Sequence, residues 1–411
     1  MASSALHSLS PHLTFKGNLR RPRHDWLRLT PAYSVHLVSD LLARQASRAD
    51  VVLDPFGGTG TTALVCAEQG IKCDMTDINP FLIWLARAKT RPCSETEVRQ
   101  FESAAAAVAE RITRDDLSPD WLPSLHQIEK WWDRETLSAL GRATDAVRDR
   151  DAPEPVADLL KVTFCRVMID RANVSFGHQS MSFKGNGNGD RLFPRSGSQA
   201  VLESWRQRAS MTAEAAQLPI LCPPGIHLCD ARKLSATLLL DHYDLVITSP
   251  PYPNRMSYVR ELRPYMYWLG FLENGRQAGE LDWQAIGGTW GCATSNLTRW
   301  QPDPKTVVPF PGYEELLTRI AGRSPVLARY VQKYFEDMVQ HSRELFCVVR
   351  PGGRINYIIG NSKFYDVLLP AEAILAAIFA SIGFRDLQVK TIRKRTSKQE
   401  LFEYVVSGRK P

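Results

Sequence analysis

Ser249-Pro250-Pro251-Tyr252 places a hydroxyl and an aromatic ring directly after residues 244–248, Asp-Leu-Val-Ile-Thr. That run has the aliphatic and β-branched residues of a buried strand. The two prolines fix φ and lack N–H donors, so the strand must end before them and the loop is stiff. Open α/β sheets bind ligands at the carboxyl ends of strands, where this loop would lie. The alternatives are an ordinary rigid loop and a ligand for a proline-recognition domain.

A glycine-rich turn forms the second candidate site. Residues 54–62 read Asp-Pro-Phe-Gly-Gly-Thr-Gly-Thr-Thr, between an apolar run (51–53) and a helical pattern (63–69). Glycines allow close approach to a ligand, and the helix amino terminus offers free N–H groups. The turn lacks both the G-x-G-x-x-G dinucleotide pattern and the Gly-Lys-Ser/Thr of a P-loop. It therefore predicts another nucleotide-type cofactor, the alternative being a tight connection without a ligand.

Together these segments resemble a known family, the S-adenosylmethionine-dependent amino-methyltransferases that act on DNA. The turn resembles the family's motif I, which implies a cofactor site at Asp54, Phe56, Gly58 and Gly60. The segment 249–252 resembles its motif IV. Ser-Pro-Pro-Tyr is most typical of cytosine-N4 enzymes, whereas Asp or Asn in first place is more typical of adenine-N6 enzymes. The chain order of the two motifs strengthens the resemblance.

The resemblance also implies a catalytic role for Ser249, Pro250, Pro251 and Tyr252. An exocyclic amine is conjugated with its ring and is a poor nucleophile. Hydrogen bonds to the Ser249 hydroxyl and the Pro250 carbonyl would turn its lone pair towards the methyl group of the cofactor. Tyr252 would stack on the base after it leaves the duplex. Transfer would be direct, without a metal or a covalent enzyme intermediate.

Two acidic residues are candidates for the nucleoside part of the cofactor. Asp77 follows a predicted strand, 71–76, and lies about 20 residues after the glycine turn, the distance at which an acidic side chain accepts from ribose hydroxyls. Asp74 competes for this role from mid-strand. Asp230 resembles the acidic residue of motif III, which contacts the adenine amine; the alternative is a helix N-cap.

An amino-terminal segment resembles motif X, which covers the methionine part of the cofactor. It spans residues 26–34, and its candidates are Thr30 and Tyr33. Thr30-Pro31 could equally begin a helix.

The remaining pattern predicts an α/β fold with a Rossmann-like methyltransferase sheet, helices on both faces and inserted subdomains. A fifth strand is expected at 355–359, a helix at 371–382, and closing strands at 386–392 and 401–407.

The predicted organisation has three parts. Residues 1–90 form the cofactor half, 91–219 a helical insertion suited to target recognition, and 220–411 the catalytic half. A second insertion, about 273–311, carries Trp283, Trp290 and Trp300 and could cap the site, contact DNA or pack as a small subdomain. Within the first insertion, residues 175–190 mix aromatics, amides and glycines, which suits a loop that orders on nucleic acid or an exposed flexible one.

Composition is consistent with a nucleic-acid enzyme. The chain has 411 residues and a net charge of +7. Basic residues gather near both ends, where phosphate binding or a merely soluble basic surface would account for them: Lys16, Arg20, Arg21, Arg23, Arg28, Lys390, Arg393, Lys394 and Arg395.

The eight cysteines include no C-x-x-C, and no Cys/His cluster has zinc spacing, which together indicate reduced thiols in the cytoplasm. Pro92-Cys93 matches the nucleophile dipeptide of cytosine-C5 enzymes but lies outside the motif IV place, so we interpret Cys93 as incidental. The sequence has no bilayer-spanning run or export signal, so no membrane partner is expected.

The sequence thus predicts a DNA amino-methyltransferase of the restriction–modification type, more readily cytosine-N4 than adenine-N6. Its partners would be S-adenosylmethionine, double-stranded DNA and, where one exists, a cognate restriction endonuclease. Two rivals stay open. A tRNA guanine-N2 methyltransferase shares a similar glycine motif but has Asp before Pro-Pro-Tyr. A non-catalytic DNA-binding relative is disfavoured by two intact motifs.

Overall fold

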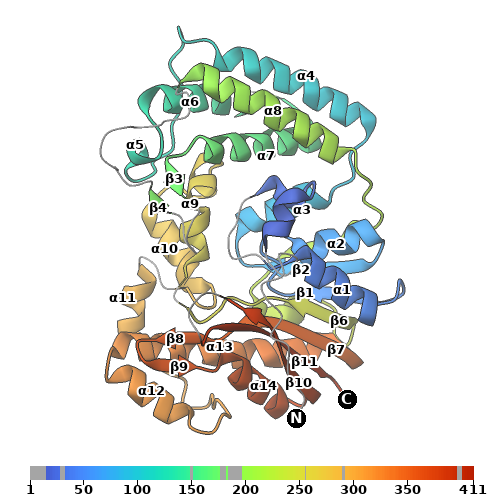
Figure 1. The fold of residues 1–411 in the computed structure, drawn as a ribbon, viewed down its shortest axis with the longest axis vertical. Helices are drawn as coiled ribbons and strands as arrows, with labels where there is room; N and C mark the ends of the chain where they lie inside the picture. The colour runs from blue at the N-terminus through green and yellow to red at the C-terminus, as the bar shows by residue number, and fades with distance from the viewer. Residues whose placement is uncertain are drawn as a thin grey trace.

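A computed structural model describes residues 15–27, 33–148, 151–175, 182–183, 197–254, 256–288, 292–395 and 400–411. Within these ranges a seven-stranded sheet has the order β10-β11-β7-β6-β1-β2-β5 (Figure 1). The strands are β1 Val51–Asp54, β2 Lys72–Asp77, β5 Gly225–Leu228, β6 Tyr243–Thr248, β7 Val349–Gly360, β10 Arg385–Lys394 and β11 Phe402–Arg409.

The sheet is mainly parallel. β5, β2, β1, β6 and β7 run parallel, and β11 pairs antiparallel with both β7 and β10. The strand order switches direction at β1, which has β2 on one side and β6 on the other. Open α/β sheets bind ligands at such a switch point. The predicted α/β class is confirmed, and each strand predicted by residue range is present within a few residues of its expected position.

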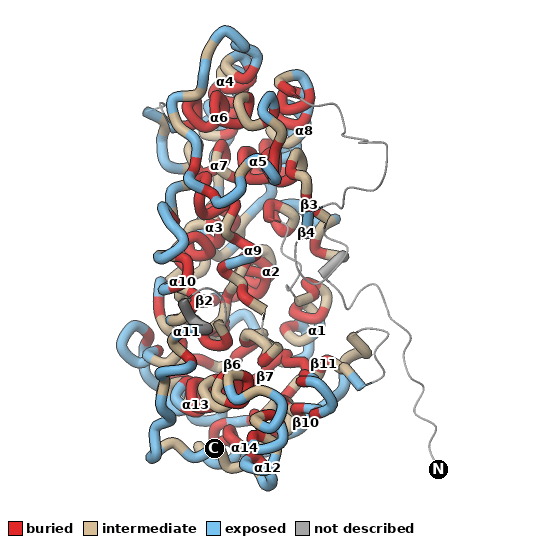
Figure 2. The backbone as a smooth tube through the Cα atoms, turned by 90° about the vertical axis from the view of Figure 1, so that its left-hand side faces the viewer, coloured by how far each residue is buried: buried red, intermediate tan, exposed pale blue. Residues whose placement is uncertain are grey.

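Helices cover both faces because successive strand residues point to opposite sides. On one face Val52, Leu245 and Ile247 pack with α1 (Val35–Gln45) and α2 (Thr61–Gln69). On the other face Leu53 and Val246 join a core that includes side chains from three further helices. These are α12 Tyr313–Ala321, α13 Pro325–Val348 and α14 Ala371–Ile382. Figure 2 shows buried residues concentrated in the strands and on the inward sides of helices.

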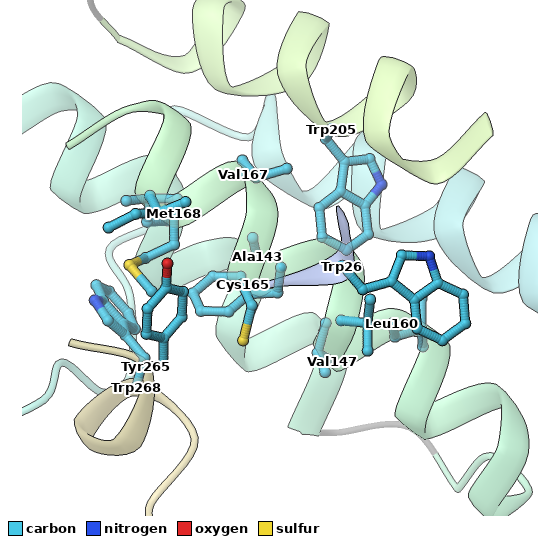
Figure 3. Close-up of a cluster of buried hydrophobic side chains, with 14 of the residues drawn as sticks. Trp26, Ala143, Val147, Leu160, Cys165, Val167, Met168, Trp205, Tyr265 and Trp268 are labelled. Carbon is cyan, nitrogen blue, oxygen red and sulfur yellow. The ribbon is translucent and has the colours of Figure 1, made fainter. Parts of the chain in front are cut away.

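The segment 91–219 forms a helical bundle at one end of the molecule (Figure 1). Its helices are α4 Glu95–Ile112, α5 Ile128–Trp131, α6 Arg134–Arg148, α7 Glu154–Asp170 and α8 Ser198–Ala216. Their apolar core continues into α3 (Pro80–Thr90) and α9 (Tyr258–Trp268). Figure 3 shows Tyr265 and Trp268 in this cluster with Met168 of α7. The bundle is therefore packed onto the catalytic part through a shared core, and the division at residues 90 and 219 stays a prediction.

Smaller elements complete the chain. The hairpin of β3 (Val174–Ser175) and β4 (Ser182–Phe183) lies beside the bundle, and most of the predicted nucleic-acid loop lies outside the described residues. The second insertion contains α10 (Gly275–Gln284) and α11 (Cys292–Arg299); Trp290 is outside the described residues. The remaining short elements are η2 Phe15–Arg20, η3 His24–Trp26, η4 Ala231–Ala236, β8 Ser362–Phe364 and β9 Val367–Leu369. None of the described helices is long and apolar enough to cross a bilayer.

Arg23 corrects the expectation that the amino-terminal basic residues bind phosphate. Its side chain is 1% exposed and donates to five backbone carbonyls. The acceptors lie at the ends of α3 and α8: Lys89, Arg91, Ala215, Ala216 and Leu218. Five donors in a rigid fork suit this arrangement, and no donor is left for a phosphate. Arg20 and Arg21 are exposed, whereas Arg28 lies outside the described residues.

Candidate active site

One pocket opens at the carboxyl ends of β1, β2, β5 and β6. It encloses about 1020 Å³ of empty space, part of it open to solvent. Residues from the glycine turn, the Asp77 and Asp230 segments, the Ser-Pro-Pro loop and the α9–α10 region line it. They are Tyr33, Pro55, Phe56, Gly57, Gly58, Thr59, Thr61, Asp77, Ile78, Asn79, Leu82, Cys229, Asp230, Ala231, Ser249, Pro251, Tyr258, Val259, Leu281, Asp282, Gln284, Ala285, Ile286 and Gly288.

The glycine turn lies against β2. Gly57 donates its N–H to the carbonyl of Thr76 at 2.9 Å, and a Cβ at Gly57 would lie 2.2 Å from the Met75 Cε. Gly58 has a φ of +52°, which favours glycine. Gly57 also lines the pocket, although the motif resemblance assigned it no role; the signal that could have found it is the pair of adjacent glycines, Gly57 and Gly58.

Gly60, predicted at the cofactor, does not line the pocket. It is the N-cap of α2 with a φ of +76°, and a Cβ there would lie 3.3 Å from the Ala86 Cβ. The positive φ of the turn and the close packing of α3 therefore explain why a glycine occupies position 60.

Asp77 fastens the turn to the end of β2. Its carboxylate accepts from the N–H of Gly58 at 2.9 Å and from the N–H of Asn79 at 2.8 Å. Burial raises the pKa of Asp77 to about 6, although the two N–H donors act in the opposite direction. Asp74, its competitor, instead accepts from the Tyr243 hydroxyl at 2.6 Å and does not line the pocket.

Asp230 lines the pocket and is the N-cap of η4, so the N-cap alternative is confirmed and the contact with the adenine amine stays a prediction. Its carboxylate pairs with Arg232 at 2.7 Å, and Arg232 also pairs with Asp337 of α13 at 2.9 Å. Burial raises the pKa of Asp230, but hydrogen bonds from Arg232 outweigh it and the net pKa is lowered. The carboxylate therefore stays ionised as an acceptor at neutral pH.

Asp54 lies beneath the pocket rather than in its lining. It is fully buried and accepts from the Tyr33 hydroxyl at 2.8 Å and from the Thr248 hydroxyl at 2.6 Å. Tyr33 does line the pocket, and burial and the neighbouring Asp54 raise the pKa of its phenol well above the ordinary value. Asp54 thus joins the ends of β1 and β6 to Tyr33. Thr30 lies outside the described residues.

His341 of α13 supports the pocket from below and was missed by sequence reasoning. Its Nδ1 is 2.8 Å from the carbonyl of Ala231, and its Nε2 is 2.6 Å from the Tyr357 hydroxyl. A carbonyl only accepts, so Nδ1 carries the proton and Tyr357 donates to Nε2. Burial lowers the pKa of His341 to about 4, which keeps this tautomer neutral. The ring also meets that of Phe56 edge-on, with centroids 4.6 Å apart.

The Ser-Pro-Pro-Tyr segment follows β6 as predicted. Ser249 lines the pocket, and its hydroxyl donates to the carbonyl of Ile358 at 3.0 Å. Pro251 also lines it, and the Pro251 carbonyl accepts from the Tyr334 hydroxyl at 2.8 Å. Pro250 is buried outside the lining. Tyr252 is likewise outside the lining, with its hydroxyl bound to Glu403 at 2.8 Å.

The α9–α10 region closes the other side of the pocket. The Ser257 hydroxyl, at the N-cap of α9, donates to Asp282 of α10 at 2.6 Å. Arg232 donates to the carbonyl of Gln284 at 2.6 Å, which connects this region to Asp230. Tyr258 lines the pocket, and burial raises its pKa to about 12. Part of the second insertion therefore borders the site, which is consistent with its predicted role of capping it. Cys93 does not line the pocket.

Comparison with known proteins agrees with this architecture. Residues 23–87 match the family described as DNA methylase, of the N6/N4 type. The type II methyltransferase M.AvaI of Nostoc sp. is 23% identical over 90% of this chain and 81% of its own length. The type II methyltransferase M.BsoBI of Geobacillus stearothermophilus is 21% identical over 95% of this chain and 85% of its own.

By these sequence matches, the chain is similar to DNA methyltransferases of the N6/N4 family. Among solved structures, the rRNA methyltransferase aviRa of Streptomyces viridochromogenes aligns over 96% of each chain with 13% identity and a TM-score of 0.32. S-adenosylmethionine is the cofactor that the sequence motifs predict. The pocket fits that group chemically, because the Asp77 and Asp230 carboxylates are acceptors for its hydroxyl and amine groups and Phe56, Ile78 and Leu82 are apolar partners for a flat ring.

Proposed function

We propose that this methyltransferase methylates the exocyclic N4 amine of cytosine in double-stranded DNA. The observation that carries the proposal is the geometry of Ser249. Ser249 lines the pocket, and because its side-chain proton is directed to the Ile358 carbonyl, the hydroxyl oxygen keeps lone pairs for an incoming N–H donor. A serine in this place is also what the resemblance associates with cytosine-N4 enzymes.

The residues of this loop would act by orienting the amine. The Ser249 oxygen and the Pro250 carbonyl accept its two N–H groups, so its lone pair points away from the base plane. S-adenosylmethionine supplies a methyl group made electrophilic by the adjacent sulfonium. Pro251, held through its carbonyl by Tyr334, keeps the loop in register with the cofactor pocket. Tyr252 stacks on the flipped base.

The cofactor residues divide into contacts and supports. We assign Asp77 to the ribose hydroxyls and Asp230 to the adenine amine, since both ionise within the pocket lining. Phe56 and Gly58 border the bound cofactor, with Tyr33 near its methionine part. Asp54 and Gly60 act from beneath, by fixing Tyr33 and the turn. Thr30 stays a prediction.

Recognition of the DNA sequence is assigned to the two insertions. The helical bundle packs onto α9, whose first residues border the pocket, so it is placed to contact DNA around a flipped base. M.AvaI and M.BsoBI are type II methyltransferases by name, which supports a restriction–modification role with a cognate endonuclease. Such an enzyme would act in the cytoplasm on chromosomal DNA.

The test is nucleoside analysis after reaction. Protein is incubated with S-adenosylmethionine carrying a labelled methyl group and either unmethylated duplex DNA or bulk tRNA, and the digest is examined by mass spectrometry. N4-methylcytosine in DNA is expected. Ser249→Ala should give at most a trace of it.

Two results would overturn the proposal in different ways. N6-methyladenine would keep the mechanism but show that Ser249 does not select cytosine. Label only in tRNA would show that DNA is the wrong substrate. Sequencing the methylated DNA would define the recognition site.

A further inference from the structure

The hydroxyl of Tyr252 is held by a carboxylate that sequence reasoning did not single out. Glu403, on β11, is 6% exposed and accepts from Tyr252 at 2.8 Å. Its second oxygen accepts from Arg393 of β10 at 2.7 Å. Burial and the neighbouring Glu403 carboxylate raise the pKa of Tyr252 well above its ordinary value. The phenol therefore stays protonated as a donor to Glu403, beside the Ser249 hydroxyl.

A second residue covers the ring itself. The guanidinium carbon of Arg395 lies 5.0 Å from the centroid of Tyr252, a cation–π distance. Arg395 is fixed in turn, because its Nη1 donates to the carbonyl of Asn361 at 2.9 Å. Gly360 makes this stacking fit: a Cβ there would lie 2.6 Å from the Arg395 Nη1 and 3.0 Å from the Tyr252 Cε2.

The supports of Tyr252 belong to a framework separate from the cofactor pocket. Glu403 pairs across the sheet with Gly360 on β7 and with Arg393 on β10. The Asn361 side chain accepts from the N–H of Phe402 at 2.9 Å. None of these residues lines the cofactor pocket. Substitution of these residues should therefore affect the position of the target base and leave the cofactor contacts unaltered.

We propose that Glu403 and Arg395 are positioning residues for methyl transfer, which hold the ring of Tyr252 so that the target base stacks on the face that Arg395 leaves open. The inference rests on the proposed function, in which Tyr252 receives the flipped base. A ring fixed at its hydroxyl and on one face loses little freedom when the base arrives. The stacked base is then held in one position relative to the Ser249 oxygen.

The test is a double-mutant cycle of Tyr252→Phe and Glu403→Leu, since Tyr252→Phe removes only the hydroxyl. Single-turnover transfer is measured at saturating cofactor and DNA, together with calorimetric affinity for S-adenosylmethionine. Each single variant should transfer about tenfold more slowly, the size expected for one hydrogen bond. The double variant should be little slower than either, because both changes break the same contact. Cofactor affinity should not change.

Further variants separate positioning from folding. Glu403→Gln keeps an acceptor for Tyr252 and should restore most of the rate that Glu403→Leu loses. Arg395→Met should weaken the fluorescence increase of 2-aminopurine placed beside the target base, which reports base flipping. Arg385→Met, at an exposed arginine that begins β10, the strand that ends just before Arg395, is the matched control.

Two outcomes would overturn the inference. If the losses of Tyr252→Phe and Glu403→Leu multiply in the double variant, Glu403 acts elsewhere. If Glu403→Gln is as slow as Glu403→Leu while Tyr252→Phe is normal, the hydrogen bond is irrelevant. Failure of the proposed function would look different, because wild-type protein would then leave DNA unmethylated or Tyr252→Ala would remain fully active.

Discussion

The cofactor side and the base side of the pocket are built differently. On the cofactor side, Asp77 binds the N–H groups of residues 2 and 19 positions away, so nearby backbone shapes the site. On the base side, Pro251 is held by a tyrosine 83 positions away, and Tyr252 by a carboxylate 151 positions away. The cofactor side is therefore shaped by hydrogen bonds to backbone N–H groups that are near in the sequence. The base side depends on contacts that form only once α13 and the sheet have packed together. Cofactor binding should therefore survive changes that abolish transfer.

Ser249→Ala should give the largest effect. The change removes the oxygen that would accept from the amine, and loss of one such preorganised partner costs about 10²–10³ in rate. Affinity for S-adenosylmethionine, measured by calorimetry, should stay within about twofold because the cofactor contacts are on the other side of the pocket. Parallel losses of rate and affinity would erase the distinction between the two sides.

Asp77→Asn should have the next largest effect, on binding rather than on the chemical step. Loss of a charged acceptor should weaken affinity for S-adenosylmethionine by about 10–100-fold. Asp74→Asn, the matched change at the other acidic residue of β2, should leave affinity unchanged because Asp74 does not line the pocket. Equal weakening by both would mean that strand stability, and not a ligand contact, is being measured.

Asp77 also predicts a pH dependence. Its folded pKa of about 6 is raised by burial, so the ionised carboxylate is disfavoured in the free protein and the protonated form persists up to that pH. Cofactor affinity should rise with pH up to about 6, level off above it, and become pH-independent in Asp77→Asn. Stability of the free protein should move the other way, falling as pH rises towards 6. A flat affinity profile for the wild type would remove Asp77 from the cofactor contacts.

Lys89→Met should give the smallest effect on activity. Lys89 is 2% exposed and donates to the carbonyl of Thr59 in the glycine turn at 3.0 Å. Burial lowers its pKa to about 7, so above that pH the unfolded chain holds a proton that the folded chain lacks. The free energy of unfolding should therefore rise with pH above about 7 in the wild type, and this rise should be lost in Lys89→Met. Denaturant unfolding at several pH values tests it, with exposed Lys72→Met as the control.

The sequence predicted the parts of the fold that depend on local pattern. Apolar runs ended by glycine or proline correctly indicated strands whose carboxyl ends meet, and they brought Phe56, Asp77, Asp230 and Ser249 to one pocket. Contacts between distant segments could not be predicted in this way. Nothing near residue 341 or 403 distinguishes His341 or Glu403 from ordinary buried or surface groups, because their roles come from packing against Phe56 and Tyr252.

The same distinction explains the misplaced residues. The resemblance to motif I assigned Asp54 and Gly60 to the cofactor along with Phe56 and Gly58. In the structure the Asp54 carboxylate binds the Thr248 hydroxyl and Gly60 packs against α3, because only one side of the turn borders the pocket. Arg23 was grouped with its basic neighbours, because charge in a sequence does not reveal which side chain is enclosed by two helix ends.

Arg23 has a consequence for exchanging recognition elements between related enzymes. Its guanidinium, which precedes the cofactor motif in the chain, closes over carbonyls at residues 215, 216 and 218, where the bundle returns to the sheet. A chimaera that replaces residues 91–219 but leaves Arg23 behind keeps the Lys89 carbonyl and must find the other four acceptors in a foreign backbone. The natural unit of exchange is therefore discontinuous: a donor bundle must be transferred together with the amino-terminal turn that clasps it.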